Sequence, residues 1–246
     1  MSEKHLFALY LNQVDIECSN SSMSGISIEN SALTHRIGRI LRLHPKDEVI
    51  LFDQKSHAQV IIETIGKTNV TVRLVQLLHN HQNIPTIQVL LPLLKRNHLE
   101  QAIYELSALG TNTIQLIKTQ KIHPLHNEKK EMVRLHNIII AAAEQTKNFS
   151  FPTLLSPISL ENALEKSRGE KIFFDPTGTE LFPWIVTARK QKTSQITLLI
   201  GPEGDLTIQE KVHVKNANFI AAKLTPTILT AHQAISLATG IIRTLM

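Results

Sequence analysis

The sequence predicts a small β-rich domain followed by an α/β domain, whose mostly parallel sheet is covered by helices on both faces. Up to about residue 78 the chain consists mostly of short apolar runs at strand spacing. From residue 86 strand and helix patterns alternate, and several strands are apolar throughout, as in buried parallel sheets. With 246 residues, 42% of them hydrophobic, the chain is long enough to bury a sizeable core.

Four strands are predicted in the first part, at residues 7–11, 48–52, 59–65 and 70–78. The segment 35–45 differs, because apolar residues recur there at helical spacing beside basic side chains, and it predicts one short helix with a basic face. Its apolar residues are Ile37, Ile40 and Leu41. The polar residues 79–83, closed by Pro85, are typical of a linker. We therefore expect a β-rich domain at 1–78, a linker at 79–85 and an α/β domain at 86–246.

Strands and helices alternate in the second part. Gly110 ends the first helix, because its missing Cβ suits left-handed backbone. Ser159 can N-cap a later helix, and Thr207 with Glu210 has the capping-box spacing that opens another. The predicted strands are 86–92, 113–119, 171–175, one ending in the turn 201–204, and 219–224; the predicted helices are 99–109, 129–147, 160–167, one from 207, and 231–245.

Composition excludes several classes of protein. The longest apolar runs fall short of the ~20 residues that cross a bilayer, and the first residues lack the pattern of a signal peptide, so we expect a cytoplasmic protein with no membrane partner. A single cysteine, Cys18, allows no disulfide within the chain. The formal charge of +5 attracts polyanions but leaves nucleic-acid binding an even choice. The histidine pairs 79/81 and 123/126 lack a third ligand at suitable spacing, so no metal site is expected.

Three strand ends are candidates for a ligand site, because ligands of open α/β sheets collect at the carboxyl ends of strands. They lie at 173–180, 196–207 and 221–234. The GPEG turn at 201–204 allows close approach to main chain, although a tight turn with an exposed Glu203 explains it equally well. The apolar loop at 224–230 lines a site or simply plugs the end of the sheet, and alone it favours the plug.

The order of these motifs resembles the RsmE family of SPOUT-class methyltransferases, which methylate N3 of a uridine in 16S ribosomal RNA of the small subunit. The resemblance is carried by HRIGRILRL, a helix ending ELSALG, a helix ending AAAEQTKN, LLIGPEG with its capping box, and LTPTILTAHQA. It extends over nearly the whole chain in the same order and spacing.

This resemblance implies a PUA-like β-barrel for RNA docking and a knotted α/β domain that binds S-adenosyl-L-methionine and dimerises. This chain departs from the family in the last motif. Thr225 replaces a Gly, Thr227 and Thr230 replace two Arg, and His232 replaces a Glu. Asp205 likewise replaces a Gly. By position, the resemblance assigns the cofactor to Asp175, Pro176, Thr177, Ile200, Gly201, Glu203, Gly204, Leu224, Thr225, Pro226, Ile228 and Leu229.

Methyl transfer to uridine N3 requires a base, since the nitrogen becomes strongly nucleophilic only as its proton leaves. Glu203 and His232 are the best-placed titratable groups in the two cofactor motifs, although either can be structural. RNA-backbone docking is assigned to the basic side chains of His35, Arg36, Arg39 and Arg42, against the alternative of a solvated helix face. Two other functions stay open: a weak or inactive RNA-binding factor of ribosome assembly, and a methyltransferase for a different nucleotide.

Overall fold

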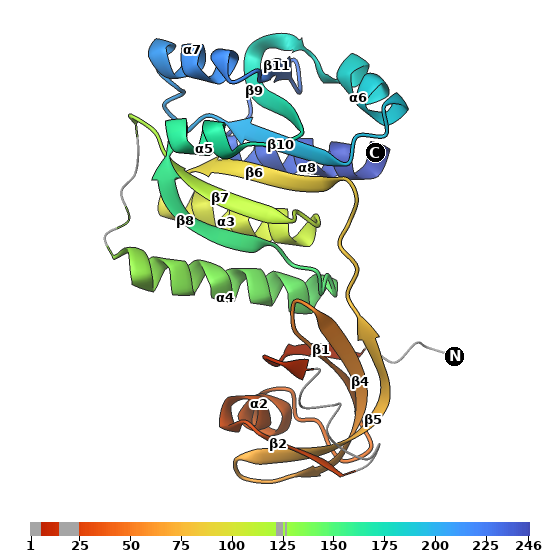
Figure 1. The fold of residues 1–246 in the computed structure, drawn as a ribbon. Helices are drawn as coiled ribbons and strands as arrows, with labels where there is room; N and C mark the ends of the chain where they lie inside the picture. The colour runs from red at the N-terminus through yellow and green to blue at the C-terminus, as the bar shows by residue number, and fades with distance from the viewer. Residues whose placement is uncertain (1–5, 15–24, 122–124, 126) are drawn as a thin grey trace. The chain divides into compact units, whose positions relative to one another are not determined.

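The computed structural model describes residues 6–14, 25–121, 125 and 127–246, and it divides the chain into two compact units (Figure 1). Unit 1 comprises residues 1–81 and 143–150, and unit 2 comprises residues 82–142 and 151–246. The sequence predicted a single crossing between the two parts, whereas the chain returns to unit 1 at 143–150. The reason is local packing: Phe149 stacks on Phe52 and His57, with 4.8 Å between ring centroids in both pairs.

Unit 1 is a five-stranded sheet around one apolar cluster. Its strands are β1 (Phe7–Tyr10), β2 (Ile26–Glu29), β3 (Glu48–Phe52), β4 (Ser56–Ile65) and β5 (Asn69–His79), in the order β1-β3-β4-β5-β2. Neighbours are antiparallel except for β1 and β3. Alternate residues of β4 are buried, such as Ala58, Val60 and Ile62, because side chains of a strand point to opposite faces. The short strand β2 was not predicted.

The helix predicted at 35–45 is wrong in its bounds. α2 spans Ser31–His35, begins at the N-cap Asn30, whose side chain accepts the Leu33 amide, and continues directly into the π-helix η1 (Arg36–Ile40). Ile37 is buried as expected, but Ile40 is exposed, because the wider π turn rotates it away from the face that packs on the sheet.

Unit 2 is built on a six-stranded, all-parallel sheet in the order β11-β9-β10-β6-β7-β8. The strands are β6 (Thr86–Pro92), β7 (Thr113–Lys118), β8 (Thr153–Ser159), β9 (Glu170–Glu180), β10 (Gln195–Ile200) and β11 (Ile220–Lys223). The helices are α3 (Arg96–Ala108), α4 (Glu128–Thr146), α5 (Leu160–Lys166), α6 (Leu181–Lys190), α7 (Ile208–Asn216) and α8 (Ala231–Leu245).

Helices cover both faces of this sheet (Figure 1). α5 and α7 pack together over Phe173 and Leu199, whereas α3 contacts α8 behind the sheet. Within β10, Leu198 and Ile200 point away from Leu199 and are buried toward the second pair, so the strand is buried on both faces. The chain changes face between β11 and α8. The knot that the resemblance implies stays a prediction, since strand order alone does not define it.

The predicted helix caps are confirmed. Gly110 has φ +79°, Ser159 accepts the Asn162 amide, and Thr207 and Glu210 bond reciprocally. In unit 2 two elements were missed, β8 and α6, because each contains a proline that argues against regular structure. β8 tolerates its proline as an edge strand, and α6 has its proline within the first turn. None of the helices in the described ranges is both long and apolar enough to cross a bilayer.

Candidate active site

A pocket lies at the carboxyl ends of β10 and β11, beside a bulge in the middle of β9. β11 pairs with β9 at Phe173 and next at Thr179, so residues 174–178 are skipped in the pairing with β11, although Phe174 still pairs with Ile200 of β10. This bulge forms one wall of the pocket. Gly178 closes this bulge, and a Cβ there would lie 2.5 Å from the Ala222 amide nitrogen, so only glycine fits without a backbone shift. The loop 224–229 and Ala234 of α8 complete a cavity of about 70 Å³.

Most residues that the resemblance assigns to the cofactor lie in this pocket. Asp175, Pro176, Ile200, Leu224, Thr225, Ile228 and Leu229 line it. The other assigned residues do not line the pocket. Thr177 bonds to Asp175, and Pro226 borders an adjoining groove. Gly201, Glu203 and Gly204 lie in the turn after β10. Four further lining residues were not named in advance, although all of them lie inside the segments 173–180 and 221–234 that the sequence singled out: Phe174, Ala222, Thr227 and Ala234.

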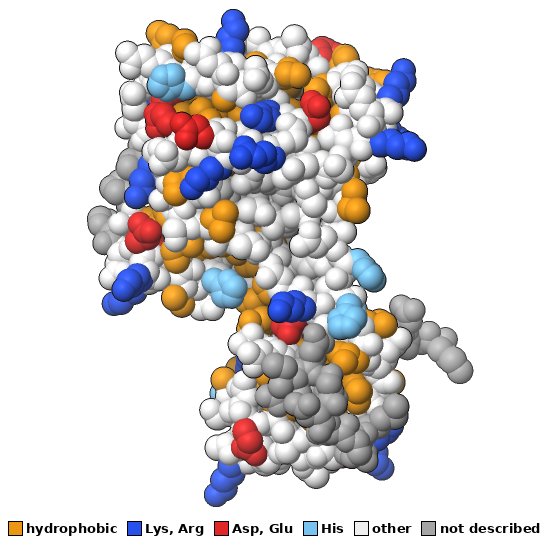
Figure 2. Space-filling view, viewed as in Figure 1, with side chains coloured by type: hydrophobic (Ala, Val, Ile, Leu, Met, Phe, Trp, Pro, Cys, Tyr) orange, Lys and Arg blue, Asp and Glu red, His pale blue; other side chains and the backbone are white. Residues whose placement is uncertain are grey.

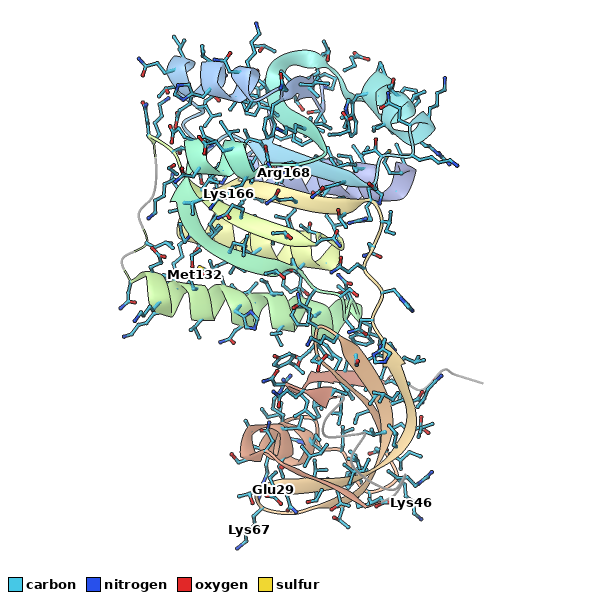
Figure 3. The ribbon with its side chains drawn as sticks, in the orientation of Figure 1. Glu29, Lys46, Lys67, Met132, Lys166 and Arg168 are labelled. Carbon is cyan, nitrogen blue, oxygen red and sulfur yellow. The ribbon has the colours of Figure 1, made fainter. Side chains whose placement is uncertain are left out.

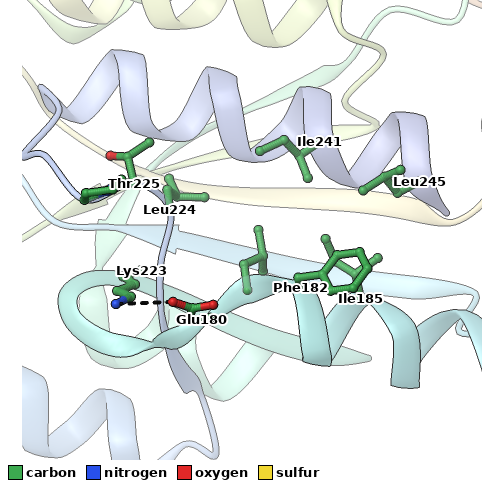
Figure 4. Close-up of a pocket in the computed structure, with 10 residues that line it drawn as sticks. Glu180, Phe182, Ile185, Lys223, Leu224, Thr225, Ile241 and Leu245 are labelled. Carbon is green, nitrogen blue, oxygen red and sulfur yellow. Dashed lines mark ion pairs between the residues drawn. The ribbon is translucent and has the colours of Figure 1, made fainter.

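The adjoining groove runs between α6 and the last turns of α8 (Figure 4). Its volume is about 450 Å³, and Phe182, Ile185, Ile241 and Leu245 make it mainly apolar. Lys223 and Glu180 form an ion pair of 3.5 Å at its rim. Leu224 and Thr225 border both the groove and the pocket, so the two cavities are neighbours.

A buried carboxylate anchors the bulge. Asp175 accepts hydrogen bonds from the amide and hydroxyl of Thr177 at 2.8 and 2.7 Å, and it pairs with Lys211 of α7 at 2.7 Å. Lys211 also pairs with Asp205 at 2.7 Å. Burial raises the pKa of Asp175, but the bonds from Lys211 and Thr177 outweigh it and hold this pKa below its ordinary value. Burial likewise lowers the pKa of Lys211, and its two carboxylate partners more than reverse that effect.

The GPEG turn is held from outside the pocket. A Cβ on Gly201 would lie 3.2 Å from an Asp205 carboxylate oxygen, and Lys121 Nζ donates to the Gly204 carbonyl at 2.5 Å. Glu203 Oε1 accepts from the Lys95 amide at 3.1 Å and bonds to His98 Nδ1 at 3.0 Å. The predicted catalytic carboxylate is therefore tied to the start of α3.

The second predicted catalytic residue joins the same cluster. The ring of His232 stacks on that of His98, with centroids 4.8 Å apart and planes tilted by 31°. His232 is buried, and its Nδ1 bonds to Thr230 Oγ1 at 3.1 Å. The structure thus brings Glu203 and His232 together through His98. Sequence reasoning missed His98 and Lys211 because the partners of both are distant in the chain: Glu203 for His98, and Asp175 for Lys211.

Unit 1 contains a basic hollow. His35, Arg39, His44 and Lys67 border a cavity of about 490 Å³, and Lys67 stands at the tip of the β4–β5 hairpin (Figure 3). Arg42 has φ +53° and does not border the hollow. On the visible face in Figure 2, Lys and Arg side chains are spread out and form no single continuous patch.

Arg36 lies apart from the other predicted RNA-docking residues. Both of its terminal nitrogens donate to the Glu144 carboxylate at 2.7 Å, and the Tyr10 amide donates to the same carboxylate at 3.1 Å. The pKa of Arg36 is raised, chiefly by these hydrogen bonds, against the lowering effect of burial. Glu144 therefore balances the charge of Arg36 within unit 1.

The sequence predicted no metal site at the histidine pairs 79/81 and 123/126. His79 bonds to Ser56 at 3.0 Å, and His123 and His126 lie outside the described residues, as does Cys18. In the part of the chain that the structure describes, no group of three or more His, Cys, Asp or Glu side chains is arranged to hold a metal ion.

Comparison with known proteins places this site in a family. The family described as RNA methyltransferase domain matches residues 81–243. A ribosomal RNA small subunit methyltransferase E from Rickettsia conorii is 26% identical over 202 residues, which cover 81% of each chain. The protein of the same name from Buchnera aphidicola is 25% identical over 219 residues, which cover 85% of this chain and 86% of its own. These matches confirm the resemblance to the RsmE family.

Solved structures confirm the fold class. The Neisseria gonorrhoeae ribosomal RNA small subunit methyltransferase E, bound to S-adenosyl methionine, has a TM-score of 0.83 at 21% identity and covers 98% of both chains. A Legionella pneumophila protein in complex with the bound cofactor SAM has a TM-score of 0.84 at 20% identity, also over 98% of both chains. The predicted combination of an N-terminal β-barrel unit and a parallel-sheet α/β unit therefore extends over the whole chain.

Proposed function

This chain belongs to the RNA methyltransferase family, and we propose that it transfers the methyl group of S-adenosylmethionine to N3 of a uridine in 16S ribosomal RNA of the small subunit. The observation that carries the proposal is the pocket at the ends of the parallel strands β10 and β11, where the bulge of β9 and the loop 224–229 meet. The curated relatives, which bear a small-subunit ribosomal RNA methyltransferase name, support the choice of RNA.

The residues of the pocket fit this cofactor. Phe174, Ile200 and Leu229 offer apolar walls to a purine, and the carboxyl ends of the strands offer main-chain polar groups beside them. The adjoining groove provides about 450 Å³ next to the 70 Å³ pocket, so a ligand with two parts has room across Leu224 and Thr225. When bound, S-adenosylmethionine supplies a methyl group activated by a sulfonium. The chain's part is to orient it, and the pairing of Asp175 with Lys211 keeps the bulge in place for that task.

The cofactor site is tested with two isoleucines that are equally exposed. Ile228 lines the pocket and Ile208 of α7 does not, yet each is 85% exposed, so neither truncation should disturb the fold. By calorimetry, Ile228→Ala should weaken S-adenosylmethionine binding about 5-fold, since about 1 kcal/mol of apolar contact is lost. Ile208→Ala should bind like the unmodified protein. Equal affinities for both variants would refute the assignment of the pocket.

We assign RNA docking to the basic hollow of unit 1. His35 and Arg39 keep the role that the sequence predicted for them, His44 and Lys67 join them, and Arg36 supports the fold through Glu144. When the logarithm of the binding constant is plotted against the logarithm of the salt concentration, each phosphate contact makes the downward slope steeper by about 1. The variant with Arg39→Glu and Lys67→Glu should therefore bind an RNA fragment more weakly and with a salt slope smaller by about 2. An unchanged slope would assign these side chains to solvent.

Mass spectrometry of ribosomal RNA nucleosides from cells with and without the protein tests the activity itself. Loss of N3-methyluridine supports the proposal. One observation favours a methyltransferase for a different nucleotide: Thr227, Thr230 and His232 stand where the family has two Arg and a Glu, which removes two guanidinium donors. Loss of another mark would support that alternative, and an unchanged set of nucleosides would support a binding-only assembly factor.

Two further features belong to the same proposal. The resemblance implies a homodimer, which analytical ultracentrifugation measures directly. The cytoplasmic location that the sequence leads us to expect is tested by cell fractionation.

A further inference from the structure

We propose that His98 is the general base that removes the N3 proton of the target uridine, with Glu203 and His232 as the residues that position it. The inference rests on the proposed function and names a catalytic residue outside the family motifs. Its basis is a cluster of three side chains from separate elements: His98 from the first turn of α3, Glu203 from the turn after β10, and His232 from the first turn of α8.

Glu203 defines which nitrogen of His98 carries a proton. A carboxylate only accepts hydrogen bonds, so the 3.0 Å contact between Glu203 Oε1 and His98 Nδ1 requires the proton on Nδ1. The neutral ring then has its lone pair on Nε2. The same carboxylate oxygen accepts from the Lys95 amide, which anchors it to the start of α3. A carboxylate that orients an imidazole and stabilises its charged form is the arrangement that a general base needs.

His232 is held in the same protonation pattern but is less accessible. The contacts of Thr230 with Gln233 show which atom donates in the bond between Thr230 and His232. The Thr230 amide and hydroxyl both donate to Gln233 Oε1, at 3.2 and 2.8 Å. Thr230 Oγ1 therefore has no second proton to give and accepts from His232 Nδ1. His232 is buried, with 7% of its surface exposed, whereas the side chain of His98 is 36% exposed. A base that meets an RNA nucleotide must be reachable from solvent, so His98 is the base and the stacked His232 ring limits its rotation.

The cluster lies next to the cofactor pocket along the chain. The loop 227–229 lines the pocket, Thr230 follows it, and Ala234, two residues after His232, lines it again. The other charged side chains near His98 on α3 are engaged elsewhere. Arg96 pairs with Glu100 at 3.2 Å, and Glu100 also pairs with Arg134 of α4.

The step balances in protons and electrons. His98 Nε2 takes the proton from uridine N3, and the electron pair of that N–H bond stays on nitrogen. The nitrogen then forms a bond to the methyl carbon as the carbon–sulfur bond breaks, and the electron pair of that bond goes to the sulfonium sulfur, which becomes a neutral thioether. The imidazolium next to Glu203 returns its proton to solvent. No oxidant or further reactant is needed.

The test is single-turnover methyl transfer to a 16S RNA fragment at saturating S-adenosylmethionine. His98→Asn should slow the step by about 10²- to 10³-fold at pH 7, since general-base catalysis typically contributes that much. The loss should shrink as the pH rises and uridine loses its own proton. It should also shrink with a fragment containing 5-fluorouridine, whose N3 proton is more acidic. A merely structural role for His98 would produce neither recovery.

Two variants keep the result interpretable. Glu203→Gln preserves an oxygen that accepts both hydrogen bonds and removes only the charge, so it should slow transfer about 10-fold, less than the loss of the base itself. His213→Asn removes the imidazole of another His–Glu pair in unit 2, the 3.8 Å contact with Glu161, and should leave the rate unchanged. Cofactor affinity and the fluorescence of the single tryptophan, Trp184, show whether each variant is folded.

The outcomes separate the two proposals. If the unmodified protein makes N3-methyluridine and His98→Asn transfers methyl at the same rate, His98 is not the base. A slow His98→Asn variant that neither high pH nor 5-fluorouridine restores also overturns the base and leaves His98 a structural residue. If the unmodified protein makes no methyluridine on the fragment or on small subunits, the proposed function fails, and the base fails with it.

Discussion

Removing the positive charge of Lys211 should destabilise unit 2 by about 2 kcal/mol, because it leaves a buried carboxylate without its cation. The Asp175 side chain is only 5% exposed, and loss of one partner from a buried pair typically costs about 3–5 kcal/mol. Two facts reduce that figure for Lys211→Met. Lys211 is itself 33% exposed, and Asp175 keeps both hydrogen bonds from Thr177. The other ion pair of Lys211, to Asp205, adds little, since Asp205 is 58% exposed.

The assay is urea unfolding followed by the fluorescence of Trp184, which lies in α6 and so reports on unit 2. Asp205→Asn is the matched control: asparagine also adopts the positive φ of +60° at this position, and the change should cost less than about 1 kcal/mol. Adding Asp175→Asn to Lys211→Met should recover part of the loss, because the variant then buries a neutral amide and no unpaired charge.

The same variant should show a defined pH dependence. The folded pKa of Asp175 lies below its ordinary 3.8, so its ion pair contributes stability that is present above about pH 5 and is lost as the pH falls through the folded pKa. The deficit of Lys211→Met should therefore be largest near pH 7 and shrink toward pH 3. A deficit below about 0.5 kcal/mol at pH 7, or one equally large at pH 3, would refute this account of the anchor.

Three further predictions concern other contacts. Glu210→Ala should lower the free energy of unfolding of unit 2 by about 2 kcal/mol in urea, because the buried carboxylate caps α7 through Thr207 and also accepts the Gln120 amide. A loss below about 0.5 kcal/mol would contradict that role. Glu144→Gln should destabilise unit 1 by about 1–2 kcal/mol, measured by amide hydrogen exchange of β1 and β3, since it removes the charge that the Arg36 guanidinium pairs with; unchanged exchange would contradict it. Gly178→Ala should weaken S-adenosylmethionine binding in calorimetry. Gly25→Ala, where the added Cβ meets open space but φ is positive, is the control for backbone strain, and equal affinities would count against the bulge as a pocket wall.

Much of the framework of this protein was predictable because it depends on local patterns. The alternation of apolar runs and helical periods predicted the parallel sheet, and the caps at Gly110, Ser159 and Thr207 lie where the sequence placed them. The three segments singled out as ligand sites do meet at one pocket. Two of them do so because the carboxyl ends of the parallel strands β10 and β11 share one edge of the sheet, and the third does so through the bulge of β9. Where local signals conflicted, as at the prolines of β8 and α6, the elements were missed.

For residues that act through long-range contacts, the tertiary structure alone determined which partner each one has. Arg36 and Arg39 belong to the same short segment and each precedes an isoleucine, yet Arg36 pairs with a carboxylate 108 residues away while Arg39 borders an open hollow. Likewise His98 meets Glu203 across 105 residues, and Lys211 reaches Asp175 across 36. Propensity, capping and periodicity act over a few neighbouring residues and so are readable from the chain itself. Ion pairs and ring contacts depend on which side chains the packed sheet and helices bring within a few ångströms of each other, and only the folded chain defines that.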